Sequence, residues 1–283
     1  GVYSFDYQIC EQLNPSNCAI ATETVTVVAA PILAVDDGAT GINGADGDNN
    51  VLNVLDADTL NGDPADLSTV TITLATGSTV PPGLAFHPDT GLVRVKAGTP
   101  AGTYTFDYTI CEILNPSNCS TATVTVEVIA APIAAVSESV SGINGASGED
   151  DVLNALAGDT LNGDPATVGT VTIALAPGET LPAGLSFDTA TGNVSVNPGT
   201  PAGTYSFDYQ ICEQLNPTNC AIATETVTVV AAPISAADDT ANGINGTAGA
   251  AGVLNVLDGD LLDGSPADPS TVNITVATGS SVP

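Results

Sequence analysis

The sequence predicts an all-β protein built from tandem Greek-key β-sandwich domains of 101 residues each. Three observations predict it: the chain repeats itself at a constant interval, short segments alternate apolar and polar residues, and Gly, Pro, Asn and Asp interrupt these segments. Alternation with period two places one face of a strand in a core. About seven short strands in about 100 residues are typical of a sandwich.

The repeat is read most easily from the cysteines. Cys10, Cys111 and Cys212 follow one another at intervals of 101 residues, and so do Cys18, Cys119 and Cys220. Solenoid repeats are shorter, at about 20–50 residues, whereas about 100 residues are enough for a small independent domain. We therefore expect a beads-on-a-string array in which each copy closes its own core.

The tripeptide Ala-Ala-Pro recurs after the last strand-like run of each copy and is expected to link the domains. The expected domains are the C-terminal strands of a truncated repeat, two complete repeats and the N-terminal part of a further truncated repeat: 1–30, 31–131, 132–232 and 233–283. We expect the sequence to be a window of a longer array. Residues 1–30 match 203–232 more closely than 102–131, which predicts an array that alternates two kinds of repeat.

The segment from Tyr104 to Ile110 shows the strand pattern most clearly, with Tyr104, Phe106, Tyr108 and Ile110 on one face. Its Tyr104 follows the turn Pro100-Ala-Gly-Thr, which is the sequence context of the tyrosine corner of Ig-like sandwiches. The alternative is a core aromatic without that hydrogen bond. The G-I-N-G tetrads that begin at Gly41, Gly142 and Gly243 follow no strand-to-helix pattern and are expected to lie in loops.

Several of these motifs together resemble a known group. The segments Leu181–Phe187 and Gly199–Tyr205, and Val51–Asp58 preceded by Asp36 and Asp37, are similar to the Ig-like and cadherin-like repeats of large secreted bacterial surface adhesins and fibres. The resemblance covers essentially the whole chain and is specific for the type of domain, but not for a ligand. It implies exposure on a bacterial cell surface, tandem arrays and, in many members, Ca²⁺ at acidic sites.

Each copy carries two cysteines on either side of an Asn-Pro turn, between strands that should be hairpin neighbours. Disulfides are therefore predicted for the pairs Cys10–Cys18, Cys111–Cys119 and Cys212–Cys220. The alternative, a metal site, lacks ligands because a structural zinc site needs four and no His or further Cys recurs nearby. One disulfide per domain indicates an oxidising, extracellular compartment.

Acidic residues recur in register at positions where loops meet strands. The candidate Ca²⁺ ligands are Asp36, Asp37, Asp56, Asp58, Asp238, Asp239, Asp258 and Asp260. Carboxylate oxygens of this kind suit the Ca²⁺ sites of extracellular modules, with dissociation constants of about 10⁻⁴–10⁻³ M. The copy 132–232 has Ser137, Glu138, Ala157 and Asp159 instead, so a full site is not expected there. The alternative is that these acids cap turns and keep the surface soluble.

The composition excludes several functions. The 283 residues include 2 Lys or Arg and 32 Asp or Glu, a net charge of −30, so neither nucleic acid nor an anionic membrane surface is an expected partner. No apolar run is long enough for a transmembrane helix. His87 is the only histidine and lies in a predicted turn, and no nucleophile elbow, phosphate-binding loop or metalloprotease motif is present. The sequence therefore predicts no enzyme.

The leading hypothesis is a structural extracellular protein: a surface stalk, fibre or matrix filament, stiffened by Ca²⁺, whose partners are neighbouring copies of itself. The alternative hypothesis is an adhesin module that binds a glycan or a protein. The absence of Trp and the total of only 11 Tyr and Phe residues count against sugar binding by aromatic stacking. A third hypothesis is an accessory domain of a secreted enzyme.

Overall fold

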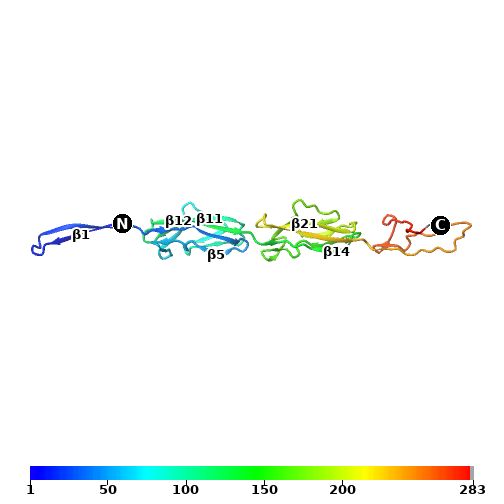
Figure 1. Ribbon diagram of the computed structural model, residues 1–283, viewed down its shortest axis with the longest axis horizontal. Helices are drawn as coiled ribbons and strands as arrows, with labels where there is room; N and C mark the ends of the chain where they lie inside the picture. The colour runs from blue at the N-terminus through cyan, green and yellow to red at the C-terminus, as the bar shows by residue number, and fades with distance from the viewer. Residues whose placement is uncertain (281–283) are drawn as a thin grey trace. The chain divides into compact units, whose positions relative to one another are not determined.

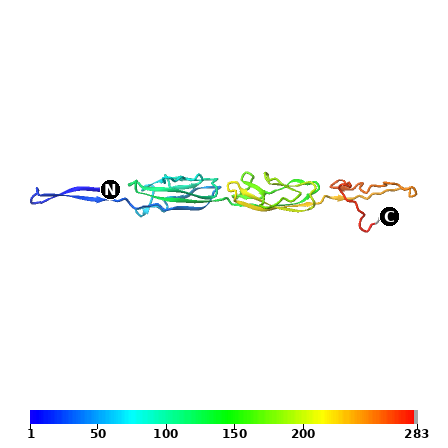
Figure 2. The same cartoon turned by 90° about the horizontal axis from the view of Figure 1, so that it is seen from above.

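The computed structural model describes residues 1–280, and none of them is helical. The fold is all-β, as predicted. By their internal contacts the residues divide into two compact units, Gly1–Ala131 and Pro132–Pro283. Each unit holds one complete sandwich, called here the first repeat (31–131) and the second repeat (132–232). The two layers of each sandwich can be followed in both views (Figures 1 and 2).

The first repeat has a four-stranded sheet in the order β4-β12-β11-β8 and a three-stranded sheet in the order β5-β10-β9, with a small sheet β3-β6-β7 beside them. Strand β4 runs parallel to β12, and the other pairs are antiparallel. The strands are β3 (Ile32–Leu33), β4 (Asp37–Asn43), β5 (Asp48–Asn53), β6 (Thr59–Leu60), β7 (Asp63–Pro64), β8 (Val70–Leu74), β9 (Leu84–His87), β10 (Leu92–Val95), β11 (Gly102–Glu112) and β12 (Cys119–Ile129).

The second repeat has the same topology, with sheets β14-β22-β21-β18, β15-β20-β19 and β13-β16-β17. Its strands are β13 (Ile133–Ala134), β14 (Ser139–Asn144), β15 (Glu149–Asn154), β16 (Thr160–Leu161), β17 (Asp164–Pro165), β18 (Val171–Leu175), β19 (Leu185–Phe187), β20 (Asn193–Val196), β21 (Gly203–Glu213) and β22 (Cys220–Val230).

Alternating residues of the long strands form the core of each repeat. In β11 the side chains of Phe106, Tyr108 and Ile110 are buried against the facing sheet, as the sequence pattern predicts. Phe106 also packs against Phe86 of β9, with ring centroids 5.0 Å apart. Burial of such side chains removes apolar surface from water, which is the main favourable contribution to folding.

The G-I-N-G tetrads were expected in loops, and this expectation is wrong for the first two. Gly41 lies within β4, where its φ of 75° accompanies a shift in the register of β4 against β12. Gly44 follows the strand directly, and its carbonyl oxygen accepts hydrogen bonds from the backbone N–H groups of Gly98 and Thr99. A Cβ on Gly44 would overlap the carbonyl oxygen of Thr99. The tetrad therefore bends the strand and allows a close approach of two backbones.

Two further segments flank the complete repeats. Residues 1–30, called here the N-terminal hairpin, form β1 (Val2–Cys10) and β2 (Cys18–Thr26), which pair only with each other. Residues 233–280, called here the C-terminal segment, form the short strands β23 (Ile234–Ser235), β24 (Leu261–Leu262) and β25 (Ser265–Pro266). Residues 281–283, at the end of the expected fourth domain, lie outside the described range.

Candidate functional site

The first repeat holds a buried acidic site built around Tyr108 and Asp58. The Tyr108 hydroxyl lies 3.0 Å from both carboxylate oxygens of Asp58 and donates to this carboxylate. It also lies 2.8 Å from the carbonyl oxygen of Val54 and 3.1 Å from that of Val35. Asp58 is only 1% exposed, and its burial raises its pKa. One donor therefore meets four acceptor oxygens.

Asp37 lies beside this group, at the start of β4. Its Oδ2 is buried and has no hydrogen-bond partner in the described residues. Burial, and then the negative charges of Asp58, Asp56 and Asp36, raise the pKa of Asp37 to about 6, although Tyr108 counteracts the rise. The structure therefore brings Asp37 and Asp58 close together, while their role as metal ligands stays a prediction.

Asp36 and Asp56 are exposed at the edge of the site. The Asp36 carboxylate accepts a hydrogen bond of 2.8 Å from the backbone N–H of Thr123. In the second repeat the Ser137 hydroxyl accepts the corresponding hydrogen bond from Thr224. Because a serine can replace Asp36 in this contact, the contact itself joins β4 to β12 and does not require a carboxylate.

The second repeat conserves the centre of the site and changes its surroundings. The Tyr209 hydroxyl donates to Asp159, 3.0 Å from both oxygens, as Tyr108 does to Asp58. Glu138 stands in place of Asp37, and Glu225 stands where the first repeat has Val124. Glu225 is completely buried. The sequence places Tyr108 on the core face of its strand but predicts no site role for Tyr108, Tyr209 or Glu225. The one available signal was Glu225 itself, which interrupts the apolar alternation of β22.

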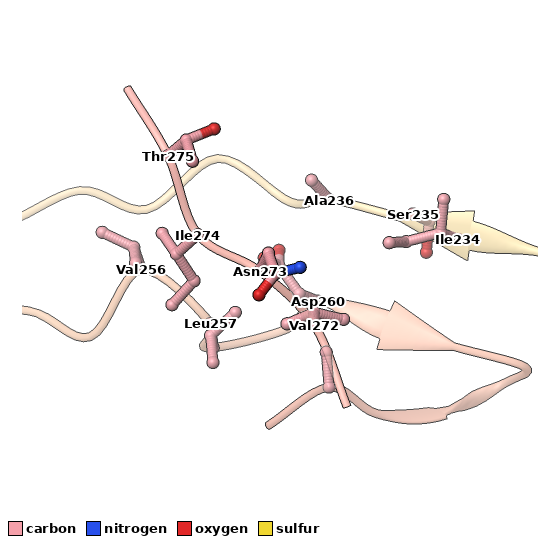
Figure 3. Close-up of a pocket in the computed structure, with 11 residues that line it drawn as sticks. Ile234, Ser235, Ala236, Val256, Leu257, Asp260, Val272, Asn273, Ile274 and Thr275 are labelled. Atoms are coloured by element: carbon pink, nitrogen blue, oxygen red, sulfur yellow. The ribbon is translucent and has the colours of Figure 1, made fainter. Parts of the chain in front are cut away.

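The C-terminal segment shows the same site without its tyrosine. The Asp260 carboxylate accepts a hydrogen bond of 2.8 Å from the N–H of Ala237, as Asp58 does from Val35. Beside it is a cavity of about 290 Å³, lined partly by Val256, Leu257 and Ile274; Figure 3 shows these three side chains grouped together. In the complete repeats the hairpins that carry Tyr108 and Tyr209 pack at the corresponding place.

The remaining predicted ligands of this segment are Asp238, Asp239 and Asp258. Asp238 and Asp258 are exposed, and Asp239 is partly buried. Within residues 1–280 no group of three or more His, Cys, Asp and Glu side chains has the arrangement of a metal site. The groups at the first-repeat site that could bind a metal ion are nonetheless all oxygens, from two carboxylates and two backbone carbonyls. One of the Asp37 carboxylate oxygens is buried and has no hydrogen-bond partner. Such a donor set fits the chemistry of Ca²⁺.

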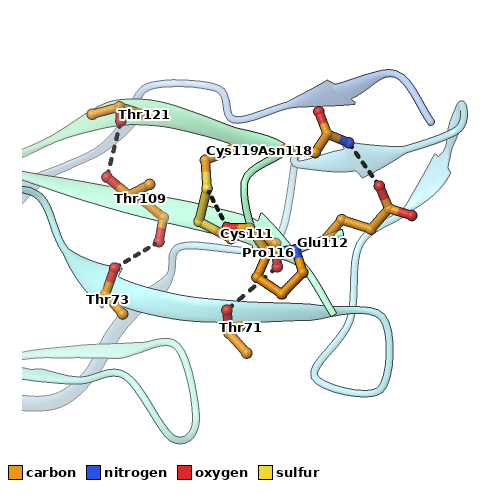
Figure 4. The surroundings of a disulfide bond; sticks show 9 residues. All are labelled: Thr71, Thr73, Thr109, Cys111, Glu112, Pro116, Asn118, Cys119 and Thr121. Atoms are coloured by element: carbon orange, nitrogen blue, oxygen red, sulfur yellow. Dashed lines mark hydrogen bonds between the residues drawn. A yellow bond between two sulfur atoms is a disulfide. The ribbon is translucent and has the colours of Figure 1, made fainter. Parts of the chain in front are cut away.

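The six cysteines form the three expected pairs, Cys10–Cys18, Cys111–Cys119 and Cys212–Cys220. Figure 4 shows the pair between β11 and β12, beside the Asn-Pro turn. Hydrogen bonds between its own side chains hold this turn: Asn115 and Asn118 donate to the two carboxylate oxygens of Glu112, at 2.7 and 2.8 Å. Glu112 is itself buried. Each disulfide thus closes a hairpin that is already held by an Asn–Glu network.

The predicted tyrosine corners are present in both complete repeats. The Tyr104 hydroxyl donates to the carbonyl oxygen of Pro100 at 2.8 Å, and Tyr205 does the same to Pro201. These hydrogen bonds fix the start of β11 and β21. A corner of this kind is a hallmark of Ig-like sandwiches. The two complete repeats therefore have both the sandwich topology and the tyrosine corner of Ig-like domains.

Residues 153–232 match the family model described as "Putative Ig domain". This stretch covers most of the second repeat. The second repeat is an Ig-like domain. The first repeat shares its strand order and its tyrosine corner, so the chain contains tandem Ig-like repeats. Ig-like domains with disulfides indicate an extracellular protein with an adhesive or structural role, and such domains are typically not enzymes.

Solved structures of cadherin ectodomains are similar to this chain at a coarse level. The mouse cadherin-23 EC22-24 structure is 15% identical with a TM-score of 0.32, over 81% of this chain and 74% of that one. The human desmocollin-1 ectodomain is 14% identical with a TM-score of 0.31, over 77% of this chain and 45% of that one. None of the curated proteins compared matches the chain.

No helix in residues 1–280 has the length and apolar character needed to cross a membrane.

Proposed function

We propose that the chain is a structural extracellular protein whose tandem Ig-like repeats form a surface stalk, fibre or matrix filament. One observation carries the proposal: the contacts that close a repeat recur in the next one at the same positions. The Tyr–Asp contact, the tyrosine corner and the disulfide appear in both complete repeats. Repetition of closed domains provides length and many identical surfaces, which suits weak contacts that add up by multivalency.

The linker residues support a stiff array. In the first unit the Ala30 carbonyl oxygen accepts a hydrogen bond of 2.7 Å from the Asn118 side chain. The next carbonyl, that of Pro31, accepts one of 2.7 Å from the backbone N–H of Asn61. The proline also restricts the backbone torsion φ. Because two successive linker carbonyls are held by the first repeat, this linker has less freedom than a solvated one.

Ca²⁺ is the proposed stiffening ion. Asp37 and Asp58 would hold it together with backbone carbonyls, and Asp36 and Asp56 would provide further charge; Asp238, Asp239, Asp258 and Asp260 are the corresponding set in the C-terminal segment. Calorimetric titration of the chelator-treated chain with CaCl₂ should show binding that Asp37→Asn together with Asp58→Asn weakens. A titration without heat and without a thermal shift would remove Ca²⁺ from the proposal while leaving the stalk intact.

Neighbouring copies of the chain are the proposed partners. The support is the cavity beside Asp260, which has the lining that a hairpin fills in the complete repeats. The N-terminal hairpin exposes the matching apolar face, with Phe5 and Ile9 more than half exposed. Sedimentation velocity over a range of concentrations should show association that Ile9→Lys reduces. Association that is unchanged in Ile9→Lys would exclude this contact.

Electron micrographs of the chain test the stalk directly. We expect extended particles whose length varies little, and a chelator should make them more bent if Ca²⁺ stiffens the linkers. Compact globules in both conditions would contradict the proposal. The ligand-binding alternative has less support, because Phe106 and Tyr108 are buried in the core and Tyr104 is tied to its corner, which leaves few aromatic rings for sugar stacking.

A further inference from the structure

The second repeat buries an acid, Glu225, whose two carboxylate oxygens make no hydrogen bond of normal geometry, although the nearby backbone N–H of Glu138 partly offsets the rise in its pKa. Glu225 lies on β22 with 0% of its surface exposed. Neither of its carboxylate oxygens has a hydrogen-bond partner, and the Oε2 of Glu138 is in the same situation. Burial of a carboxylate without a partner is so costly that such groups are normally paired or neutral. Some group or ion must therefore neutralise Glu225 in the folded repeat.

A basic side chain cannot do so, because residues 132–232 contain no Lys, Arg or His. The titratable groups that face Glu225 are all acids or phenols. They come from three different segments: Glu138 from the residue before β14, Asp159 from the turn before β16, and Tyr209 from β21. The neutralising species is therefore a proton or a cation from the solvent.

The geometry favours the proton. The carboxyl groups of Glu138 and Glu225 face each other closely enough to hydrogen-bond when one of them is protonated. A single proton between them satisfies two otherwise unpartnered groups at once. Two carboxylates that share a site commonly behave in this way, because both cannot ionise side by side. A cation would need further ligands, whereas one proton needs only the two carboxyl groups that face each other.

The first repeat provides an internal comparison. It has Val124 at the position of Glu225 and Asp37 at the position of Glu138. Val124 is buried in the hydrophobic core, so an apolar residue fits this place in the same fold. Glu225 is therefore not needed to build the sandwich, and it adds a third acid to a site that already holds Glu138 and Asp159.

We propose that Glu138 and Glu225 share one proton in the folded second repeat, and that this proton makes the second repeat an acid-stabilised domain next to a first repeat that lacks the device. Burial, followed by the neighbouring Glu138 carboxyl and the charge of Asp159, raises the pKa of Glu225 to about 9. A raised pKa stabilises the folded state below the unfolded value and loses this effect as the pH rises through the folded value.

The pH window separates the two repeats. In the first repeat the pKa of Asp37 is raised only to about 6, so its stabilising contribution has already disappeared once the pH has risen to neutral. Between about pH 6 and pH 9 only the second repeat should weaken, by up to about tenfold in its folding equilibrium constant per pH unit. Under alkaline conditions the second repeat should therefore lose stability that the first repeat keeps.

The test is thermal unfolding of the full chain at pH 6 and pH 8.5 in the presence of a chelator. The wild-type transition of the second repeat should move to lower temperature at pH 8.5. Glu225→Val, which introduces the residue of the first repeat, and Glu225→Gln, which keeps the shape but cannot ionise, should both remove the shift. Glu127→Gln changes an exposed acid of β12 and should leave both transitions as they are. Proton release on unfolding at pH 7 should be about one per chain in the wild type and absent in both Glu225 variants.

Two results would overturn the proposal. One is a pH shift of the same size in Glu225→Gln, which would assign the effect to other groups. The other is rescue of the wild-type transition at pH 8.5 by CaCl₂ with a binding heat that Glu225→Val abolishes, which would make the pair a cation site. Neither result would affect the stalk, because the stalk depends on the closed repeats and not on how Glu225 is neutralised.

Discussion

The hydroxyl of Tyr108 lies 3.0 Å from both carboxylate oxygens of Asp58, and Tyr209 stands at the same distances from Asp159. The two residues of each pair are 50 positions apart in the chain. Each pair joins the long strand of the four-stranded sheet, β11 or β21, to the turn that follows β5 or β15 of the opposite sheet. The contact therefore links the two layers of each sandwich by a buried hydrogen bond, and it should affect the stability of each repeat and its dependence on pH.

Removal of the hydroxyl should destabilise the first repeat. In Tyr108→Phe the buried Asp58 keeps the hydrogen bond from Val35 but loses its donor from β11. A buried acceptor that loses its donor costs about 1–3 kcal/mol. Urea or thermal unfolding of the full chain should show this loss in one transition only. Tyr209→Phe is the matched variant and should shift the other transition, so a variant that lowers both transitions equally would contradict the independence of the repeats.

The pH dependence of the first repeat should reflect Asp37. Burial, with the nearby carboxylates, raises the pKa of Asp37 to about 6, above its ordinary value of about 4. The group therefore stabilises the fold fully below about pH 4, and this effect disappears as the pH rises through about 6. Unfolding of the chelated chain between pH 4 and pH 7 should show the decline, and Asp37→Asn should flatten it. A first repeat that becomes more stable over this range would contradict the assignment.

Added Ca²⁺ should reverse that decline if it binds at this site. The ion requires ionised carboxylates, so its effect should appear above about pH 6 and vanish in acid. Comparison of CaCl₂ with MgCl₂ at pH 7.5 is informative, because Mg²⁺ demands a stricter octahedral geometry. We expect CaCl₂ to raise the first transition more than MgCl₂ does. Equal effects of both salts, or an equal effect in Asp37→Asn, would indicate screening of the net charge of −30.

The disulfides should contribute to stability through the unfolded state. The pair Cys111–Cys119 has a sequence separation of 8, and closure of such a short loop contributes about 2–3 kcal/mol in the chain-entropy model. The double variant Cys111→Ser/Cys119→Ser should lose that amount, with the first repeat still folded through its Asn–Glu network. Thiol titration of the native, unreduced wild type should find no free thiol. Free thiols there would show that the hairpins are closed without the bond.

The sequence was sufficient for the features that recur or alternate. The 101-residue interval, the alternation in Tyr104–Ile110 and the cysteine spacing predicted the two sandwiches, the core face of β11 and the disulfide pairs. The Tyr108 contact with Asp58 was not predicted, because tyrosine in an apolar alternation also fits an ordinary core residue. Whether its hydroxyl finds a carboxylate depends on the packing of two strands that are distant in the chain.

Glu225 shows a second limit of sequence patterns. It occupies an inward position of β22, where the pattern expects an apolar residue, and its partner Glu138 is 87 positions earlier. The comparison of Val124 with Glu225 marks the site as unusual, but only the structure shows that both Glu225 oxygens are buried without a donor. The loop prediction was wrong for the first two G-I-N-G tetrads for a similar reason, because β4 pairs in parallel with the distant β12. The close backbone contact of Gly44 likewise comes from a remote segment.

Gly44 allows a test of that close contact with a control in the same chain. In Gly44→Ala the new Cβ would overlap the carbonyl oxygen of Thr99, and overpacking of this kind costs about 1–3 kcal/mol. Gly246 holds the corresponding position in the C-terminal segment, where a Cβ would meet nothing within 4 Å. Gly246→Ala should therefore leave the unfolding of both repeats unchanged. If Gly44→Ala were equally neutral, the backbones at Gly44 and Thr99 could separate at little cost, and the tetrad would not be what holds β4 to the opposite layer.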